Sequence, residues 1–144
     1  DKEMIGTAAA TTLFNKHSGV LGVSGLSSDM RDIEKAINEG NPRAKLALDM
    51  YEYRIKKYIG AYAAALNGFD VLVFTGGVGE NQTATREKVC KNLSFMGIEI
   101  DTEINKTRGE ELLISTKNSK VKVVVIPTDE EYMIATDTIG LVGK

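Results

Sequence analysis

The chain has 144 residues, 18 basic and 20 acidic side chains, a formal net charge of −2, 42% hydrophobic residues and 26% charged residues. This length fits one domain that buries roughly two thirds of its unfolded surface. The near balance of charge gives no electrostatic reason to expect nucleic acid or an anionic membrane as a partner. A single cysteine, Cys90, excludes an internal disulfide, and the sequence shows no signal peptide or long apolar run, so we expect a cytoplasmic protein.

The first part of the chain predicts a short helix followed by an ordered loop. Residues 7–15 contain enough Ala and Leu to favour a helix, which ends at a polar turn around His17, the only histidine. We expect His17 to be a solvated loop residue, because a general base or a metal site needs partners that nothing nearby supplies. Residues 18–32 combine small residues with apolar ones at alternating places, which indicates an ordered loop and not a linker.

Ser28 or Asp29 can cap the helix that follows this loop and ends near Gly40. Composition alone favours a capping role for this pair of residues and a solvated charge for Arg31. A binding role for the same segment stays open, because function concentrates on such loops.

The longest predicted element is an amphipathic helix that begins at Asn41-Pro42, with Asn as N-cap and Pro at the first helical position. Apolar residues keep a spacing of three to four as far as Leu66, so the helix would span roughly 36 Å at 1.5 Å per residue. Its apolar stripe contains Tyr51, Tyr58 and Tyr62. Aromatic residues on such a stripe favour the core or a dimer contact over ligand stacking, and we expect the core.

Residues 71–75 predict a strand buried on both faces in the middle of an α/β sheet. The glycine-rich residues 76–81 then predict a turn at the end of this strand, where open α/β sheets bind ligands. Glycines allow the main chain to approach a phosphate or a nucleoside, although a purely structural tight turn remains the alternative. No P-loop follows, and Gln82 occupies the place of the third glycine of a dinucleotide fingerprint. Thr83 can cap the next helix.

The last third predicts a short strand over residues 97–101, a polar helix or loop over 102–109, and two strands over 112–115 and 121–126. A closing helix begins after Pro127, with Thr128 as N-cap and Glu131 as its capping-box partner.

Three polar clusters therefore follow apolar segments: residues 29–31, 76–81 and 129–131. Carboxylates at such places can hold Mg²⁺ through oxygen, and glycines can admit phosphates, which together suggest Mg-nucleotide chemistry. The favourable helix dipole alone can also explain acidic residues at a helix start. Phosphoryl transfer needs mainly positioning and charge neutralisation, so it requires no catalytic triad.

Four segments of the chain, residues 24–31, 54–62, 74–81 and 125–131, resemble the acetate kinase family in order and in spacing. The resemblance runs from about Leu13 to Ile139 and matches only the carboxyl-terminal part of the family enzyme. It implies an α/β fold of the ribonuclease H-like class shared with actin-like ATPases, here partial, with a mixed sheet flanked by helices. It also implies Mg²⁺-dependent, reversible transfer of a phosphoryl group from ATP to acetate, giving acetyl phosphate and ADP, and a homodimer.

The resemblance also assigns roles to individual residues. It places three residues beside the adenosine, five in a second nucleotide-binding turn and one carboxylate at the Mg²⁺ site: Asp29, Met30 and Arg31; Gly77, Val78, Gly79, Glu80 and Asn81; and Glu130. It assigns no catalytic residue to this chain, because the family's substrate-binding and catalytic groups belong to the amino-terminal part. We therefore expect the chain alone to be inert or nearly so, and residues 129–144 to form a closing helix that contacts the absent domain.

Other functions remain open at this point. A propionate or butyrate kinase would share these motifs, because the acyl pocket belongs to the absent domain. A noncatalytic module that dimerises and binds nucleotide weakly is a second alternative. A dinucleotide-dependent oxidoreductase is a third, and Gln82 argues against it.

Overall fold

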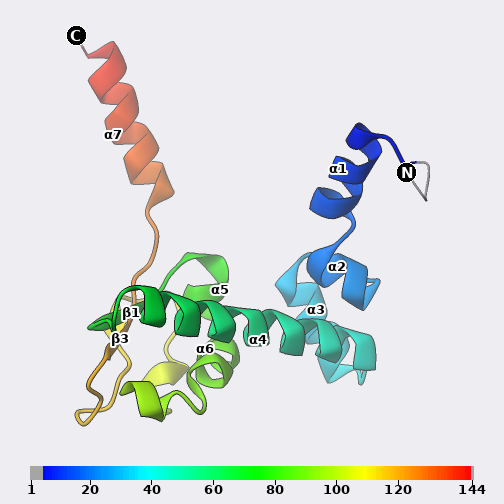
Figure 1. Cartoon of the computed structure of the whole chain (residues 1–144). Helices are drawn as coiled ribbons and strands as arrows, with labels where there is room; N and C mark the ends of the chain where they lie inside the picture. Colours follow the sequence, from blue (N-terminus) through cyan, green and yellow to red (C-terminus); the bar gives the residue numbers. More distant parts are fainter. Residues whose placement is uncertain (1–4, 144) are drawn as a thin grey trace. The chain divides into compact units, whose positions relative to one another are not determined.

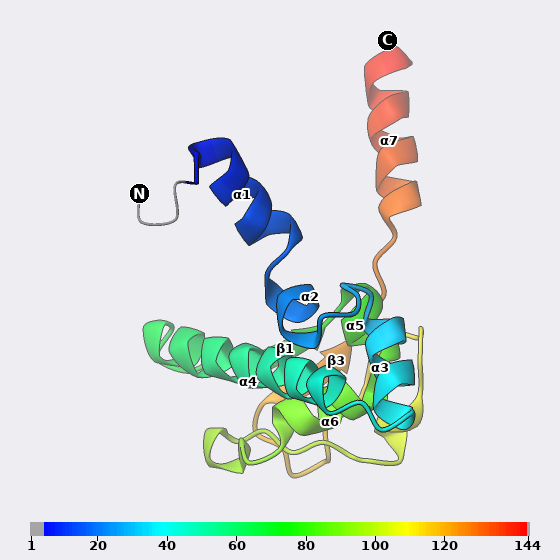
Figure 2. The same ribbon diagram turned by 90° about the vertical axis from the view of Figure 1, so that its right-hand side faces the viewer.

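The computed structural model describes residues 5–143 of the chain. These residues form two compact units, residues 5–61 and residues 62–143. The boundary between the units falls inside the long helix α4 (Pro42–Ala65). Figure 1 colours the elements in chain order, and Figure 2 shows them turned by 90°. No helix within residues 5–143 combines the length and the apolar character that crossing a membrane requires.

The first unit is helical. It contains α1 (Thr7–Lys16), α2 (Gly19–Ser24), α3 (Met30–Asn38) and α4 as far as Ala61. The helix predicted over residues 7–15 is confirmed, whereas the loop predicted over residues 18–32 is wrong for α2. This short helix ends at Gly25, which has a φ of 67° and donates its N–H to the Leu21 carbonyl at 2.7 Å. A glycine in the left-handed region is a common helix end, but among so many small residues the sequence does not mark which glycine takes this role.

Side-chain caps start both α3 and α4, as the sequence predicts. One carboxylate oxygen of Asp29 accepts a hydrogen bond from the Arg31 N–H at 2.9 Å. The Asn41 side-chain oxygen accepts from the Arg43 N–H at 2.9 Å and from the Ala44 N–H at 3.1 Å. These bonds satisfy amide groups that have no partner inside a helix.

The core of the first unit lies between α3 and the first turns of α4, which lie side by side in both views (Figures 1 and 2). Its buried members are Ile33, Ala36, Ala44 and Leu48. The second half of the α4 stripe is not buried: Tyr58 is 52% exposed and Tyr62 is 63% exposed. The prediction that these two tyrosines belong to the core is therefore wrong for this chain, and contact with another copy stays a prediction.

The second unit is an α/β structure. Its remaining elements are β1 (Val71–Phe74), α5 (Gly76–Asn81), α6 (Thr83–Cys90), the 3-10 helices η1 (Ser94–Met96) and η2 (Ile104–Lys106), β2 (Leu112–Leu113), β3 (Lys122–Val125) and α7 (Glu130–Val142). The sheet order is β1-β3-β2, with β3 parallel to β1 and antiparallel to β2. This mixed sheet with helices confirms the predicted α/β class.

The strand before the glycines is an edge strand in the described part of the chain, and β3 is the central one. Val71 is 49% exposed and Val73 is 46% exposed, whereas Phe74 is buried. The prediction that β1 is central and buried on both faces is therefore wrong here. A run of apolar residues does not state how many strands flank it. The fully buried Val123 of β3 occupies the expected central place.

Two further predictions need correction. The strand predicted over residues 97–101 is reduced to one bridge between Ile100 and Ser115. The helix α6 begins at Thr83, with Gln82 as an N-cap that makes no side-chain cap bond, so Thr83 is not the cap. The same helix ends at Cys90, and its C-cap Lys91 has a non-helical ψ of 130°.

Candidate functional site

The first predicted site segment is held by a bidentate ion pair. The Arg31 Nε lies 3.0 and 3.2 Å from the two Asp29 carboxylate oxygens, and the Arg31 Nη2 lies 2.6 Å from Oδ2. The Asp29 carboxylate therefore caps α3 and also orients the arginine beside it. This arrangement lowers the pKa of Asp29 to about 2, chiefly through the side-chain hydrogen bond from Arg31.

The guanidinium of Arg31 nonetheless remains open to ligands. Its side chain is 88% exposed, against 40% for the Asp29 side chain. A planar, oriented and exposed guanidinium can stack on an aromatic base or bind a phosphate. Met30, between them, is half-buried and packs against the core of the first unit, so part of its side chain is committed to the fold.

The glycine-rich segment predicted as a turn is a short helix, α5, so the prediction of a turn is wrong. Three of its six residues are glycines. A Cβ on the exposed Gly77 would have no heavy atom within 4 Å. A Cβ on the buried Gly79 would lie 3.0 Å from the Phe74 carbonyl carbon. Gly77 thus leaves open space outside the helix, whereas Gly79 permits close packing of the helix on β1.

Two other members of this segment hold the helix together. The Asn81 Nδ2 donates to the Gly77 carbonyl at 3.0 Å, and the Val78 carbonyl accepts from the Gln82 N–H at 2.9 Å. Asn81 and Gly77 are both exposed residues.

Glu80 joins the helix α5 to the segment that follows β3. One of its carboxylate oxygens accepts from the Thr128 N–H at 2.9 Å and from the Thr128 hydroxyl at 3.1 Å. These bonds hold the pKa of Glu80 below its ordinary value, and the bond from the Thr128 N–H has the larger effect. The structure therefore ties residues 76–81 to Thr128, the residue that precedes the predicted cluster 129–131.

The same contact corrects the predicted capping box. Thr128 gives its hydroxyl to Glu80, and the N-cap of α7 is Asp129, whose carboxylate accepts from the Tyr132 N–H at 2.9 Å. Glu130 is the first residue of α7, and its side chain is exposed. Residues 5–143 contain no group of three or more His, Cys, Asp or Glu side chains placed to hold a metal ion.

The strongest polar cluster of the second unit involves Arg86, which the sequence analysis did not single out. This α6 residue is 0% exposed. Its guanidinium donates to the carbonyl oxygens of Gly79 and Glu80, both at 2.8 Å, and to those of Asn105 and Thr107, both at 2.7 Å. Its Nε donates to the Asn105 side-chain oxygen at 2.8 Å. Burial lowers the pKa of Arg86, and the charge of Arg108 lowers it further.

A sequence signal for this residue exists. Arg86 is in phase with the apolar Val89 and Leu93, at i+3 and i+7, so a charged residue occupies the buried face of a predicted helix. Buried charges need hydrogen-bond partners, and such a placement therefore points to a specific acceptor set.

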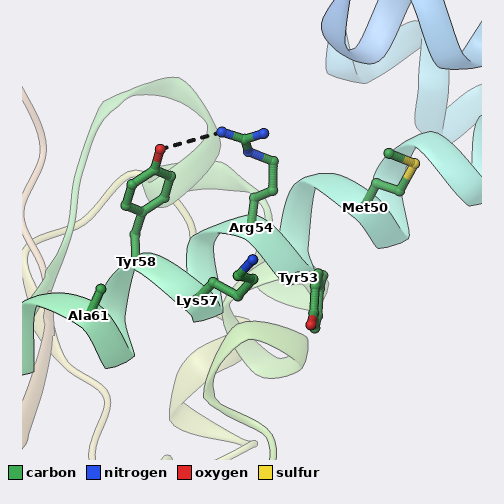
Figure 3. Close-up of a pocket in the computed structure, with 6 residues that line it drawn as sticks. All are labelled: Met50, Tyr53, Arg54, Lys57, Tyr58 and Ala61. Carbon is green, nitrogen blue, oxygen red and sulfur yellow. Dashed lines mark hydrogen bonds between the residues drawn. The ribbon is translucent and has the colours of Figure 1, made fainter.

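A groove of about 460 Å³ also runs along α4, lined by Met50, Tyr53, Arg54, Lys57, Tyr58 and Ala61. In Figure 3 the guanidinium of Arg54 points toward the Tyr58 hydroxyl, and the two groups are 3.3 Å apart. None of the predicted site residues lines this groove. It is therefore separate from the binding segments that the motifs indicate.

Comparisons with known proteins agree on one family. The model of the acetokinase family matches residues 1–136. An acetate kinase from Azobacteroides pseudotrichonymphae is 62% identical over 143 residues, which is 99% of this chain and 36% of that protein. The crystal structure of Porphyromonas gingivalis acetate kinase is 62% identical, with a TM-score of 0.91, and covers 98% of this chain and 36% of its own. A propionate kinase from Francisella tularensis is 37% identical, with a TM-score of 0.81, and covers 92% of this chain and 34% of its own. The chain thus spans about a third of the length of these relatives.

The contrast between Gly77 and Gly79 predicts opposite effects of the same substitution. Gly79→Ala should lower the free energy of unfolding by about 1–3 kcal/mol, because the new Cβ meets the main chain of Phe74. Gly77→Ala should be neutral or stabilising by up to about 1 kcal/mol, since alanine favours the helix and its Cβ meets open space. Chemical denaturation of the two variants measures both effects, and equal stability losses would contradict this assignment.

The Glu80 contact predicts a change in acid titration. A lowered pKa in the folded state stabilises that state above the unfolded pKa, and this stabilisation is lost as the pH falls through the folded value. Thr128→Ala removes the hydroxyl donor but keeps the N–H, so the Glu80 pKa should rise part of the way toward its ordinary value. An NMR titration of the Glu80 carboxyl carbon measures this shift. The control Thr138→Ala removes a hydroxyl from α7 that donates to the Ile134 carbonyl, and it should leave Glu80 unchanged.

Proposed function

The chain belongs to the acetokinase family, and on this premise we propose that it forms the nucleotide-binding part of an acetate kinase. The reaction would be the reversible transfer of the γ-phosphoryl group of ATP to acetate. The observation that carries this proposal is 62% identity, over nearly all of this chain, to proteins named acetate kinase. Because the chain spans 36% of those relatives, the activity is proposed for the whole enzyme and not for the chain alone.

Arg31 and α5 are the proposed contacts of the nucleotide. The exposed guanidinium of Arg31 is held by Asp29 in one orientation, which suits it to lie against an adenine ring or a phosphate. Gly77 leaves open space beside the main chain of α5, where a side chain would otherwise obstruct a ligand. Val78 and Asn81 would complete this contact, while Gly79 and Glu80 would act by holding α5 in place.

Glu130 is the proposed Mg²⁺ ligand. Mg²⁺ in kinases is bound through one or two carboxylates, together with phosphate oxygens and water, so one exposed carboxylate fits it without a complete protein cage. When bound, the ion neutralises charge on the transferred phosphoryl group. The hydrogen bonds from Thr128 to Glu80 would keep the Glu130 carboxylate near α5, because Thr128 precedes Glu130 by two residues.

The closing helix α7 is proposed to pack against a part of the enzyme outside this chain or against another copy. None of its residues is buried, and even the apolar Ile134 and Leu141 are 67% and 81% exposed. Apolar side chains so exposed on one helix favour a partner surface. We also propose a homodimer, with the exposed Tyr58 and Tyr62 of α4 as candidate contacts.

A propionate kinase is the second candidate, and the similarity to the Francisella tularensis structure supports it. Identity within this chain does not separate the two acceptors, because an acetate kinase from Entamoeba histolytica is 35% identical to it. A binding module without activity is a third reading of the isolated chain. It predicts dimers in sedimentation, and a strict monomer at high concentration would count against it.

Binding and chemistry are expected to separate in the isolated chain. Calorimetric titration with Mg-ADP should show binding, whereas an acetyl-hydroxamate assay with ATP and acetate should show no turnover. In-line transfer needs both reactants held and the moving charge stabilised, and the proposed site supplies the nucleotide side alone. Absence of nucleotide binding would contradict a preformed site in this chain.

Substitution of Glu130 tests the metal assignment in the full-length enzyme. Glu130→Gln should raise the Mg²⁺ concentration needed for half-maximal activity about tenfold or more, because a neutral amide is a weaker ligand for the hard cation. Glu131→Gln is the matched control, since both glutamates lie in the first turn of α7 and interact alike with the helix dipole. Equal Mg²⁺ titrations for the two variants would remove Glu130 from the metal site.

A further inference from the structure

We propose that Arg86 is the positioning residue of the nucleotide site, which it supports by fixing the main chain of α5 from the buried side. This inference rests on the proposed function, because α5 carries the proposed nucleotide contacts. Arg86 itself is fully buried and touches no ligand surface. Its effect would therefore reach the nucleotide through the carbonyl groups that it holds.

The guanidinium is completely satisfied by neutral acceptors. An arginine side chain has five N–H donors, and the structure gives Arg86 five hydrogen bonds of 2.7–2.8 Å. Four of the acceptors are main-chain carbonyl oxygens and one is a side-chain amide oxygen. No carboxylate within residues 5–143 pairs with it. Such a set fixes backbone positions, and a simple salt bridge would not.

The helix α5 needs this support. It has six residues, and three of them are glycines, so its intrinsic stability is low. The last carbonyls of any helix lack partners within it. Arg86 donates to two of them, on Gly79 and Glu80, and the Gly109 N–H adds a bond of 3.2 Å to the Glu80 carbonyl. A positive charge at the carboxyl end of a helix also interacts favourably with the helix dipole.

The other side of the guanidinium is anchored in a loop distant in sequence. The carbonyls of Asn105 and Thr107 accept from the Nη2 atom of Arg86, and the Asn105 side chain donates to the Thr83 carbonyl at 2.9 Å. One side chain thus joins α5, α6 and the residues around η2. Lysine cannot replace it, because an ammonium group lacks the planar fork that reaches two segments at once.

This role predicts a specific kinetic signature. Loss of stability alone would reduce the active fraction, and with it kcat, but would leave both Michaelis constants unchanged. A displaced α5 would instead raise the Michaelis constant for ATP and leave that for acetate unchanged. The two explanations therefore predict different Michaelis constants for ATP, which a smaller folded fraction does not change.

The test compares Arg86→Met and Arg86→Lys with the control Arg108→Met in the full-length enzyme. Arg108 is exposed and lies next to Thr107, so its substitution changes the local charge equally but breaks none of the five bonds. Arg86→Met should raise the Michaelis constant for ATP about tenfold or more, because several charge-assisted hydrogen bonds are lost. Arg86→Lys should give a smaller rise, and the Michaelis constant for acetate should stay within about twofold in every variant.

Hydrogen exchange gives a second readout that does not depend on activity. The amides of residues 76–82 should exchange faster in Arg86→Met than in Arg108→Met, and Arg86→Lys serves if Arg86→Met does not fold. Equal Michaelis constants for ATP at Arg86 and Arg108, or equal protection of α5, would overturn the positioning role. An unmodified enzyme that consumes no ATP with acetate would overturn the proposed function instead.

Discussion

The guanidinium of Arg86 is the interaction on which the second unit depends. It is fully buried and donates five hydrogen bonds to neutral oxygens of two segments, α5 and the residues around η2. A charge moved out of water without a counter-ion is tolerated only when every donor is satisfied. The chain around it must therefore adopt the conformation that presents those oxygens. The short helix α5, with its three glycines, follows from this requirement more than from its own propensity.

A second polar contact holds α5 from the other side. Thr128 donates two hydrogen bonds to the Glu80 carboxylate, so the helix is tied to the segment that leads into α7. The glycines then divide into two kinds, with Gly79 packed on β1 and Gly77 facing open space. Rigid support beneath an open main chain is the arrangement that a nucleotide contact needs, since a preformed site loses less entropy on binding. In the first unit, the Asp29 carboxylate likewise has two structural roles, because it caps α3 and also orients the exposed guanidinium of Arg31.

Local signals in the sequence predicted much of this. Caps at Asp29 and Asn41, the long helix α4 and the strand before the glycines all follow from chemistry within a few residues. The strand order does not follow from such local signals, because a run of apolar residues does not show whether a strand is central. In the structure the central strand is β3. The prediction of Thr128 as a cap is wrong because the partner of its hydroxyl, Glu80, is 48 residues away in the sequence. Arg86 was missed for the same reason, although its phase with Val89 marked a charge on a buried face.

The proposed nucleotide contacts of α5 therefore depend on one buried arginine, Arg86. The most direct measurement is a ¹H–¹⁵N NMR spectrum of the arginine side chains of this chain. If the account is right, Arg86 will show a slowly exchanging Nε–H signal and separately resolved Nη signals, because its hydrogen bonds prevent rotation of the guanidinium. A single averaged Nη signal with fast solvent exchange, as expected of the exposed Arg108, would contradict it.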